Sequence, residues 1–572
     1  MASGRLHFGL VPLALAAAVQ FASAAPLHYP LPEDSLARNG EPQVKSSHVL
    51  FKSQPDIAPL PRVGNHPHAD KGLKRHYSGT PIDVLRYHYD NYPTGWNQNE
   101  TDLTPATVAS ASFGKLTTLN VDGNVMAQPL LVSNFRMPDD SIRNVLIVAT
   151  GHNTVYAYDA QDYSLLWQVN LGKSQTSGDV GCFDIKPEYG ISSTPVIVRT
   201  ADNAATIYLV AATEPAQFSF HTKLYALDLG TGHNVLKARE IKPAANLATG
   251  GKIHFDPQNQ WSRAALAYNN GSIYVGIGSH CDNNAGQISG WMLRYDASNL
   301  KLTAKFNTID AVASYELSSI WMSGYSPAID PDGNVYAVTG NGYFNNQKGK
   351  KGYGESVLRL SPNLKKPKTF TPQEWQNLNN GDSDFGSGGA MLIPTVEGQQ
   401  APPMVVAEGK AGKIYLLDAT NPGGLQGGAS QPLQVISEGA CWCGPAYYEG
   451  PSGGIVFYQG GDVLRAYSVN TGATPSLTLT ASGTSGAGGG GSFPIVSTNG
   501  SMAGTGIVWL IRRGNPTEQL EAYDAASLGA PIFAQNAGDW SNGSRSYLSP
   551  LVANGRVYVG SKNAVTVFGL TD

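Results

Sequence analysis

The chain has 572 residues, and only 14% of them are Asp, Glu, Lys or Arg, against about 25% in an average protein. Its 65 glycines and 36 prolines make it dense in turns, while an apolar share of 41% excludes a disordered chain. The formal net charge is -4 and the basic residues are spread along the chain, so we expect no nucleic-acid partner. These properties favour a large globular β-protein.

The first 24 residues have the features of a secretory signal peptide. Arg5 provides the positive region, residues 10–19 form a short apolar stretch, and Ala22-Ser23-Ala24 is a cleavage site of the A-x-A type. The stretch is too short for a membrane anchor, which needs about 20 apolar residues. We therefore expect a secreted or periplasmic protein without a membrane anchor. Residues 25–75 are rich in Pro and His without a sustained period, which predicts an irregular linker or strap.

The four cysteines are disulfide candidates, because an exported protein meets oxidising conditions. Cys182, Cys281, Cys441 and Cys443 allow three pairings. Cys441 and Cys443 flank a single Trp, and we expect them not to bond to each other because so short a loop would be strained. Glycosylation is predicted for a eukaryotic host at the four N-x-S/T sequons, Asn99, Asn270, Asn499 and Asn542.

One phrase recurs along the body of the chain: a β-rich run, a polar loop, and a second β-rich run that often ends in Asp. Successive copies are about 70 residues apart, a longer period than that of WD40 or kelch repeats, so the units should carry long loops. The eight pairs of runs are 146–148 with 155–159, 207–210 with 224–228, 273–275 with 293–296, 335–338 with 357–360, 404–406 with 414–418, 455–457 with 464–467, 507–509 with 520–524, and 557–559 with 565–568.

Each unit also begins with a further short strand, such as residues 193–197, which gives it the four strands of a propeller blade. Eight units predict an all-β fold over residues 76–572, an eight-bladed β-propeller of four-stranded antiparallel blades. The last unit ends after its third strand at Leu570, and the strand at residues 113–119 has no partner of its own. We predict that this N-terminal strand completes the last blade and closes the ring. The alternative, two β-sandwich domains, would need a linker in mid-chain, and the sequence has none.

The propeller topology places many polar and aromatic residues on one face. Strands of a blade alternate in direction, so the connections between blades share a face with the loops that join second and third strands. Sites tend to lie on loops held by a rigid scaffold, and the mouth of the central channel is the expected pocket. The residues gathered there are His152, Cys182, Asp184, Glu214, Arg263, Cys281, Asp282, Trp291, Asn341, Asp382, Asp384, Lys410, Trp442, Arg513 and Arg545.

The phrases at 155–159 and 224–228, the latter followed by Thr231-Gly232, resemble the repeat of pyrroloquinoline quinone (PQQ) dehydrogenases, whose fold is an eight-bladed propeller. The resemblance extends from about Tyr87 to Leu570, and residues 90–97 resemble the N-terminal strap of that family. The chain is also similar to a group of exported PQQ-like propeller proteins. The resemblance implies a quinoprotein that oxidises an alcohol or sugar and, lacking a haem domain, passes electrons to a separate acceptor.

In that family a calcium ion is held by Glu, Asn and Asp over the quinone. The resemblance implies a calcium site made of Glu214, Asn341 and Asp382. Asp384 matches the general base, and Lys410 matches a cationic residue that contacts the quinone. Calcium prefers such oxygen ligands, and a Lewis acid beside a quinone carbonyl would polarise it for hydride transfer.

The quinone itself would contact three further residues. The resemblance implies that Trp291 stacks beneath the PQQ ring and that Cys182 and Asp184 lie above it. The family has two adjacent cysteines followed by Asp, whereas this chain has Cys182-Phe183-Asp184, and the Arg expected shortly afterwards is absent. Cys182 and Cys281 share a face, so a disulfide between blades in place of the vicinal one is implied.

Two alternatives stay open. Each polar motif also fits a solvated turn, and the upper-face tryptophans fit a carbohydrate-active propeller without quinone, either a polysaccharide lyase or a non-catalytic binding module. A quinoprotein needs Asn341 and the D-x-D carboxylates to converge at calcium-bond distances of about 2.3–2.6 Å, whereas a lyase needs Arg and His to converge with no ion between them. The tryptophans are Trp261, Trp321, Trp442 and Trp540.

Overall fold

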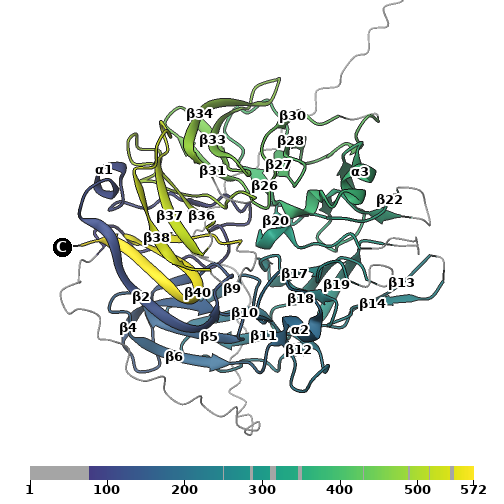
Figure 1. Ribbon diagram of the computed structural model, residues 1–572, viewed down its shortest axis with the longest axis horizontal. Helices are drawn as coiled ribbons and strands as arrows, with labels where there is room; N and C mark the ends of the chain where they lie inside the picture. Colours follow the sequence, from purple (N-terminus) through teal and green to yellow (C-terminus); the bar gives the residue numbers. More distant parts are fainter. Residues whose placement is uncertain are drawn as a thin grey trace, which may run out of the picture.

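The computed structural model describes residues 77–571, apart from 249, 284–287, 310–316, 346–350, 429–430, 487–489, 515 and 541–546. The described residues form eight small antiparallel sheets arranged as an eight-bladed β-propeller, which confirms the fold predicted from the repeat. Figure 1 shows the chain passing once around the ring, so that its yellow end meets its purple beginning. The predicted signal peptide (1–24) and linker (25–75) lie outside the described residues.

The first four blades follow one another in chain order. Their strands are, for blade 1, β3 (Leu130–Arg136), β4 (Ile142–Ala149), β5 (Thr154–Asp159) and β6 (Leu165–Asn170); for blade 2, β9 (Val196–Ala201), β10 (Ala204–Thr213), β11 (His221–Asp228) and β12 (Arg239–Glu240); for blade 3, β16 (Ala267–Asn269), β17 (Ser272–Ser279), β18 (Trp291–Asp296) and β19 (Leu302–Asn307); and for blade 4, β20 (Ala328–Ile329), β21 (Val335–Val338), β24 (Val357–Leu360) and β25 (Lys368–Thr371).

The remaining blades complete the ring. Their strands are, for blade 5, β26 (Ala390–Ile393), β27 (Met404–Glu408), β28 (Lys413–Asp418) and β30 (Gln434–Ser437); for blade 6, β31 (Ala446–Gly450), β32 (Gly453–Tyr458), β33 (Val463–Asn470) and β34 (Ser476–Gly486); for blade 7, β35 (Ile495–Ser497), β36 (Ile507–Arg512), β37 (Thr517–Asp524) and β38 (Phe533–Asp539); and for blade 8, β39 (Leu551–Ala553), β40 (Arg556–Leu570) and β2 (Phe113–Asn124).

The loops between the blade strands contain short strands and helices. The strands outside the blade cores are β1 (Trp96–Asn97), β7 (Gln175–Thr176), β8 (Glu188–Tyr189), β13 (Ala244–Asn246), β14 (Lys252–His254), β15 (Gln260–Trp261), β22 (Phe344–Asn345), β23 (Gly352–Tyr353) and β29 (Gly424–Leu425). The helices are α1 (Pro105–Val108), α2 (Ser177–Val180) and α3 (Trp375–Asn380), with 3₁₀ turns η2 (Met322–Gly324) and η3 (Phe385–Ser387). No helix in the described part of the chain is long and apolar enough to cross a membrane.

The burial of the strands explains why the repeat is so rich in Val, Ile and Tyr. Every residue of β5 is buried, because each blade packs its two faces against the blades on either side. The outermost strand is different: β6 has no fully buried residue. The inner strands of a blade are therefore apolar runs, which are the runs that repeat in the sequence, whereas the outermost strand is more exposed.

The Asp that ends many third strands has a local structural role. The carboxylate of Asp159 accepts a hydrogen bond from the backbone amide of Gln161 at 2.8 Å, and Asp296 and Asp418 do the same for Ser298 and Thr420 at 2.8 and 2.7 Å. A side chain that bonds the amide two residues ahead stabilises a turn. The repeated Asp is thus a turn former rather than a site residue.

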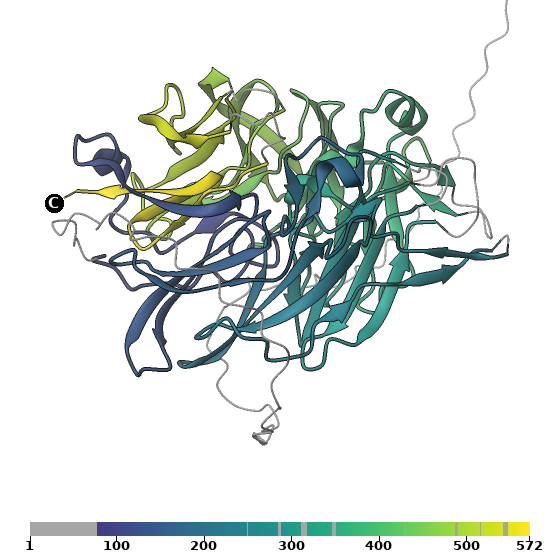
Figure 2. The same cartoon turned by 60° about the horizontal axis from the view of Figure 1, so that its bottom comes forward.

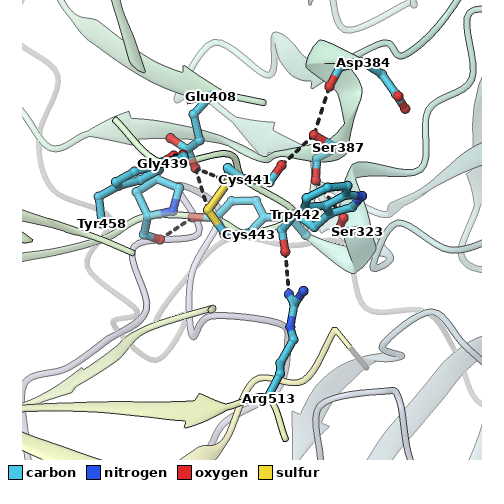
Figure 3. Close-up of a disulfide and its surroundings, with 12 residues drawn as sticks. Ser323, Asp384, Ser387, Glu408, Gly439, Cys441, Trp442, Cys443, Tyr458 and Arg513 are labelled. Carbon is cyan, nitrogen blue, oxygen red and sulfur yellow. Dashed lines mark hydrogen bonds between the residues drawn. A yellow bond between two sulfur atoms is a disulfide. The ribbon is translucent and has the colours of Figure 1, made fainter. Parts of the chain in front are cut away.

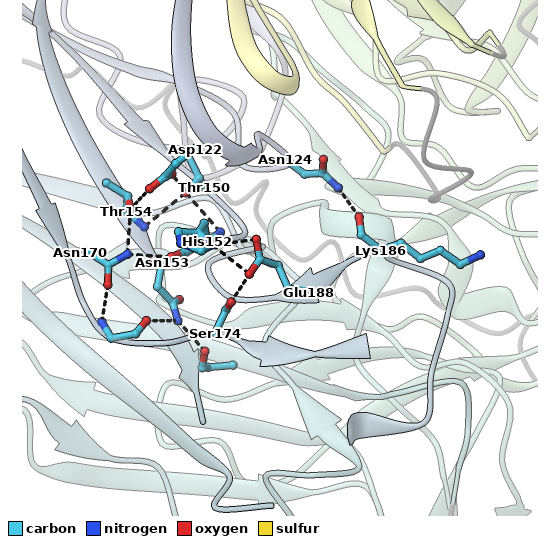
Figure 4. Close-up of polar contacts among 12 residues, drawn as sticks. Asp122, Asn124, Thr150, His152, Asn153, Thr154, Asn170, Ser174, Lys186 and Glu188 are labelled. Atoms are coloured by element: carbon cyan, nitrogen blue, oxygen red, sulfur yellow. Dashed lines mark hydrogen bonds and ion pairs between the residues drawn. The ribbon is translucent and has the colours of Figure 1, made fainter. Parts of the chain in front are cut away.

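The ring closes as predicted. Strand β2 pairs antiparallel with β40, with Phe113 opposite Leu570, and the two strands lie side by side in Figures 1 and 2. Polar contacts then tie β2 to blade 1 and to the next connection (Figure 4): Asp122 accepts from Thr150 at 2.9 Å, and Asn124 donates to the carbonyl of Lys186 at 2.7 Å. The N-terminal strand therefore joins the last blade to the first.

The segment 84–96 is a strap that contacts the first strand of all eight blades. Backbone bonds join it to six of them, and the Arg86 and Tyr89 side chains reach blades 3 and 8. The backbone pairs are Val84–Leu131, Leu85–Ile197, Asn91–Ile329, Tyr92–Leu392, Thr94–Tyr447 and Gly95–Val496. A segment that touches every innermost strand must cross the central axis, so it closes the channel at this level.

Two disulfides are present. Cys182 is bonded to Cys281, which is the inter-blade pair that the resemblance implied. Cys441 is bonded to Cys443, and our expectation that these two would not pair is wrong. Both of these sulfurs are fully buried, and packing against blade 5 holds the two ends of the C-W-C loop together.

Candidate functional site

The candidate site lies on the face that the topology predicts. Asp384, Lys410, Asn341 and Asp282 come from the connection between blades 4 and 5, the β27–β28 turn, the loop after β21 and the loop after β17. All are connections between blades or loops between second and third strands. We call Asp282, Asn341, Asp382, Asp384 and Lys410 the carboxylate–lysine cluster.

Lys410 is at the centre of this cluster. Its Nζ lies 2.6 Å from Asp384 Oδ1 and 2.9 Å from Asp382 Oδ1, and it also donates to the backbone carbonyl of Asp382 at 3.1 Å. The Asp384 carboxylate is 6% exposed, whereas that of Asp382 is 77% exposed. Asp384 is therefore the buried partner, and Asp382 is the solvated one.

Asn341 connects the lysine to a further acid. Its amide nitrogen donates to Asp382 Oδ1 at 2.8 Å and to Asp282 Oδ2 at 3.3 Å. Its amide oxygen is buried and has no hydrogen-bond partner among the described residues. A buried oxygen without a partner is unusual, and it is free to serve as a ligand.

Burial and charge shift the titration of these groups. Burial raises the pKa of Asp384 to about 6, although the Lys410 ammonium opposes the rise. Burial lowers the pKa of Lys410, but the carboxylates of Asp384 and Asp382 outweigh it and the net shift is upward. Burial also raises the pKa of nearby Glu355 well above its usual range, with a further rise from Asp384. Asp384 thus titrates close to neutrality, as a general base should.

Aromatic rings surround the lysine. The Lys410 ammonium lies 6.0 Å from the Trp321 ring and 5.5 Å from the Trp442 ring, and Trp321 Nε1 donates to Asp384 Oδ2 at 3.1 Å. Tyr547 packs edge-on against Trp321 with ring centroids 6.0 Å apart. Three aromatic rings and the Lys410 ammonium therefore lie together where the connections that lead into blades 4, 6 and 8 approach one another.

Two arginines border Tyr547. The guanidinium carbon of Arg513 lies 4.8 Å from the Tyr547 ring, and that of Arg263 lies 5.6 Å from it. Arg263 precedes blade 3 and Arg513 follows β36 of blade 7. Connections from opposite sides of a propeller can meet only at the axis, so these residues lie at the mouth of the channel. We call Arg263 and Arg513 the arginine pair.

The C-W-C loop holds Trp442 in this arrangement (Figure 3). Ser387 Oγ donates to the carbonyl of Cys441 at 2.6 Å, and Arg513 donates to the carbonyl of Trp442 at 2.5 Å. Glu408 Oε1 lies 3.8 Å from the sulfur of Cys441. A disulfide sulfur carries no hydrogen, so this contact is not a hydrogen bond donated by Cys441, and burial raises the pKa of Glu408 well above its usual range.

Glu214 lies apart from the cluster. Its fully buried carboxylate accepts from the backbone amide of Phe218 at 2.7 Å and from that of Thr176 at 3.4 Å, with Lys173 at 3.9 Å. None of its contacts within the described residues reaches Asn341 or Asp382. Asn341 and Asp382 are therefore together as predicted, and Glu214 stabilises a loop of blade 2.

The three predicted quinone contacts are also outside the cluster. Trp291 is fully buried among the apolar side chains between blades 2 and 3, where strand β18 places it. Cys182 is buried and bonded to Cys281, and Asp184 is exposed beside it. This disulfide connects to the cluster only indirectly, because Cys281 is followed by Asp282.

The structure adds residues that the sequence did not single out for the quinone site. Trp321, Trp442 and the arginine pair had been placed on the upper face without a role beside Lys410. Tyr547 had not been identified at all. The signal that finds them is topological, since all five lie on connections between blades or on loops between second and third strands. Arg545 lies outside the described residues.

Three solved structures illustrate what the fold resembles. The chain is similar to a europium-containing methanol dehydrogenase, with a TM-score of 0.55 and 14% identity over 86% of this chain and 98% of the other. It is similar to the quinohemoprotein alcohol dehydrogenase of Comamonas testosteroni, with a TM-score of 0.54 and 15% identity over 85% and 80%. For the quinohemoprotein alcohol dehydrogenase ADHIIG of Pseudomonas putida HK5 the TM-score is 0.52 at 14% identity over 86% and 80%.

No protein-family model matches the sequence, and no curated protein matches it at the sequence level. The likeness is therefore one of architecture, and it covers most of each chain. This chain has the eight-bladed propeller fold of the quinoprotein alcohol and methanol dehydrogenases.

Proposed function

We propose that this protein is an exported quinoprotein-like oxidoreductase that oxidises an alcohol or a sugar hydroxyl with PQQ and calcium. The observation that carries the proposal is a buried carboxylate, Asp384, that titrates near neutrality beside Lys410 and Trp321 at the channel mouth. The fold shared with dehydrogenases supports it. Electrons would pass to a separate acceptor.

The carboxylate–lysine cluster fits a calcium ion. The cluster holds three carboxylates, on Asp282, Asp382 and Asp384, and one ammonium, on Lys410, so its formal charge is about -2, which matches a divalent cation. The unpartnered amide oxygen of Asn341 is the kind of neutral oxygen ligand that calcium uses. Asn341, Asp382 and Asp282 would hold the ion, with Glu214 excluded by its position.

The rings beside Lys410 fit a flat anionic group. Trp321 and Trp442 both face the ammonium, so a planar quinone would find an aromatic surface and a positive charge together, and these two rings replace Trp291 in the proposal. A bound quinone would supply the two-electron acceptor for the hydride of the substrate carbon. The chain supplies the other half of the reaction, the removal of the hydroxyl proton.

Asp384 is the proton acceptor in this scheme. Trp321 holds Oδ2 and Lys410 holds Oδ1, so the carboxylate is fixed in position before substrate arrives. With a pKa raised to about 6, it is ionised at pH 7 and yet basic enough to accept a proton, the combination that general-base catalysis requires. Activity should therefore rise as the pH increases through about 6.

A dye-linked assay tests the function. Wild-type protein loaded with PQQ and calcium is screened against primary alcohols and sugars, beside Asp384→Asn and a matched control, Asp332→Asn, at an exposed turn of blade 4. Loss of a general base should lower kcat by about 10²–10⁴-fold, while the control retains full activity. Equal activity of Asp384→Asn and the wild type would refute the role of Asp384.

A second candidate is a carbohydrate-binding propeller without quinone. Trp321, Trp442 and Tyr547 at one mouth would suit stacking on sugar rings. A lyase is less well supported, because no histidine of the described residues contacts the arginine pair, and His280 packs instead between Trp261 and Tyr189. Sugar binding without any PQQ binding would favour this candidate.

Export and glycosylation remain part of the proposal. Asn99 and Asn270 are exposed and Asn499 is partly exposed, so the three sequons are open to a glycosyltransferase, while Asn542 lies outside the described residues. The intact mass of the protein secreted from a eukaryotic host, before and after deglycosylation, measures both cleavage of residues 1–24 and glycan addition.

A further inference from the structure

The arginine pair brings positive charge to the channel mouth. Arg263 is only 1% exposed, and it donates to the backbone carbonyls of Ser192 at 2.8 Å and Tyr547 at 3.3 Å. Gly324 packs against the guanidinium so closely that a Cβ there would lie 2.2 Å from Nη1. The side chain is therefore held rigidly, with the strap residue Tyr87 close by.

The charge of Arg263 has no carboxylate partner in the part of the chain that the structure describes. No carboxylate of the described residues lies within 4.0 Å of its guanidinium, and its Nε has no hydrogen-bond partner among them. Burial lowers its pKa to about 10, and Arg513 adds to the lowering, so the two cations are close enough to repel each other. Buried charges are normally paired. Lys410 follows this rule, because it has two carboxylate partners, whereas Arg263 does not.

The surroundings of Arg263 indicate what would neutralise its charge. Both guanidinium groups lie near the Tyr547 ring, and Trp321 contacts both Tyr547 and Asp384. A ligand that bridged the two clusters would carry a carboxylate at one end, a flat or apolar face in the middle and a hydroxyl at the other end. Guanidinium groups bind carboxylates through paired hydrogen bonds.

We propose that the substrate is a carboxylate-bearing sugar or related hydroxy acid, whose carboxylate binds the arginine pair while its hydroxyl lies against Asp384. This inference rests on the proposed oxidation at Asp384 and names the class of substrate. Carboxylates of a quinone have the same chemistry, so the experiment separates the two sources.

Isothermal titration of the purified protein, without cofactor, with D-glucuronate and D-glucose tests the inference. Wild type should bind glucuronate at least about tenfold more tightly than glucose, and Arg513→Gln should lose that preference, with its glucuronate affinity falling to that of glucose. Arg136→Gln, at an exposed surface arginine with a 48% exposed side chain, is the matched control and should behave as wild type. Arg263→Gln should act like Arg513→Gln where it folds, and Arg513→Lys should retain part of the preference.

Three results would overturn the inference: equal affinities for the two sugars, a preference that survives Arg513→Gln, or displacement of glucuronate by PQQ. The last would show that the guanidinium groups serve the quinone. Unchanged glucuronate affinity in PQQ-saturated protein supports a separate substrate site. Tight glucuronate binding without turnover in the loaded protein would reject the oxidation while leaving the carboxylate site in place, so the two failures are distinguishable.

Discussion

The interaction of Lys410 with Asp384 should contribute far more free energy to folding than its interaction with Asp382, although its ammonium contacts both. The Lys410 side chain is 12% exposed and that of Asp384 is 6% exposed, while Asp382 is 77% exposed. Removing one partner of a buried pair costs about 3–5 kcal/mol, because the other charge is left without compensation. An exposed pair contributes about 0.2–1 kcal/mol. Lys410→Met should therefore lower the free energy of unfolding by about 3–5 kcal/mol, almost all of it through Asp384.

Two double-mutant cycles measure this difference. Urea unfolding is followed for Lys410→Met combined with Asp384→Asn, and for Lys410→Met combined with Asp382→Asn, in calcium-free buffer. The Asp384 cycle should give a coupling energy of about 3 kcal/mol or more, and the Asp382 cycle one below about 1 kcal/mol. Added calcium should stabilise Lys410→Met more than the wild type, since a divalent ion would replace the missing ammonium. Equal coupling energies in the two cycles would refute the description of the site.

Three further predictions follow from the frame of the propeller. Glu188 raises the pKa of His152 through a 3.0 Å contact, so the pair stabilises the fold at acidic pH and loses its effect as the pH rises through the raised folded pKa. The melting temperatures of wild type and His152→Gln should therefore differ by an amount worth at most about 1 kcal/mol at acidic pH and should converge once His152 is neutral in the folded protein. Replacing Cys182 and Cys281 by Ser should lower the free energy of unfolding by about 4–5 kcal/mol, because this bond closes a loop with a sequence separation of 99. Replacing Cys441 and Cys443 should lower it by only about 1–2 kcal/mol. Denaturant titration compares the two variants, and a larger loss in the second would contradict the loop-entropy argument. Tyr89→Phe removes the hydroxyl that bonds both backbone groups of Val552, and it should lower the free energy of unfolding by about 1–3 kcal/mol. The same titration measures this loss, and an unchanged stability would show that the strap does not support blade 8.

The architecture could be predicted because local sequence patterns determine its strands and turns. The β-rich runs, the Asp turns and the unpaired strand at residues 113–119 each have a local cause, and β2 pairs with β40 as that strand required. The pairing of Cys441 with Cys443 could not be predicted from spacing, because it depends on how blade 5 buries both ends of the C-W-C loop.

The sequence could predict which face of the propeller carries the site, but not which side chains of that face turn toward it. Asp384, Lys410, Asn341 and Asp382 meet as the motif order indicates. Trp291 and Trp321 cannot be told apart in the sequence, since both adjoin strands on the same face, but β18 buries Trp291 between blades while Trp321 turns toward Asp384. Which side chain faces the axis depends on the packing of neighbouring blades, and that information is not local.

The central claim is that the channel mouth binds a quinone together with calcium, and a titration tests it most directly. Purified protein is titrated with PQQ while tryptophan fluorescence is followed, with calcium and with a chelator, for the wild type, Asn341→Ala and Asp384→Ala. The account predicts saturable quenching by Trp321 and Trp442 that requires calcium and is lost in both variants. Absence of binding up to about millimolar PQQ, an affinity of only about 4 kcal/mol, or binding that is unaffected by calcium and by both variants, would contradict it.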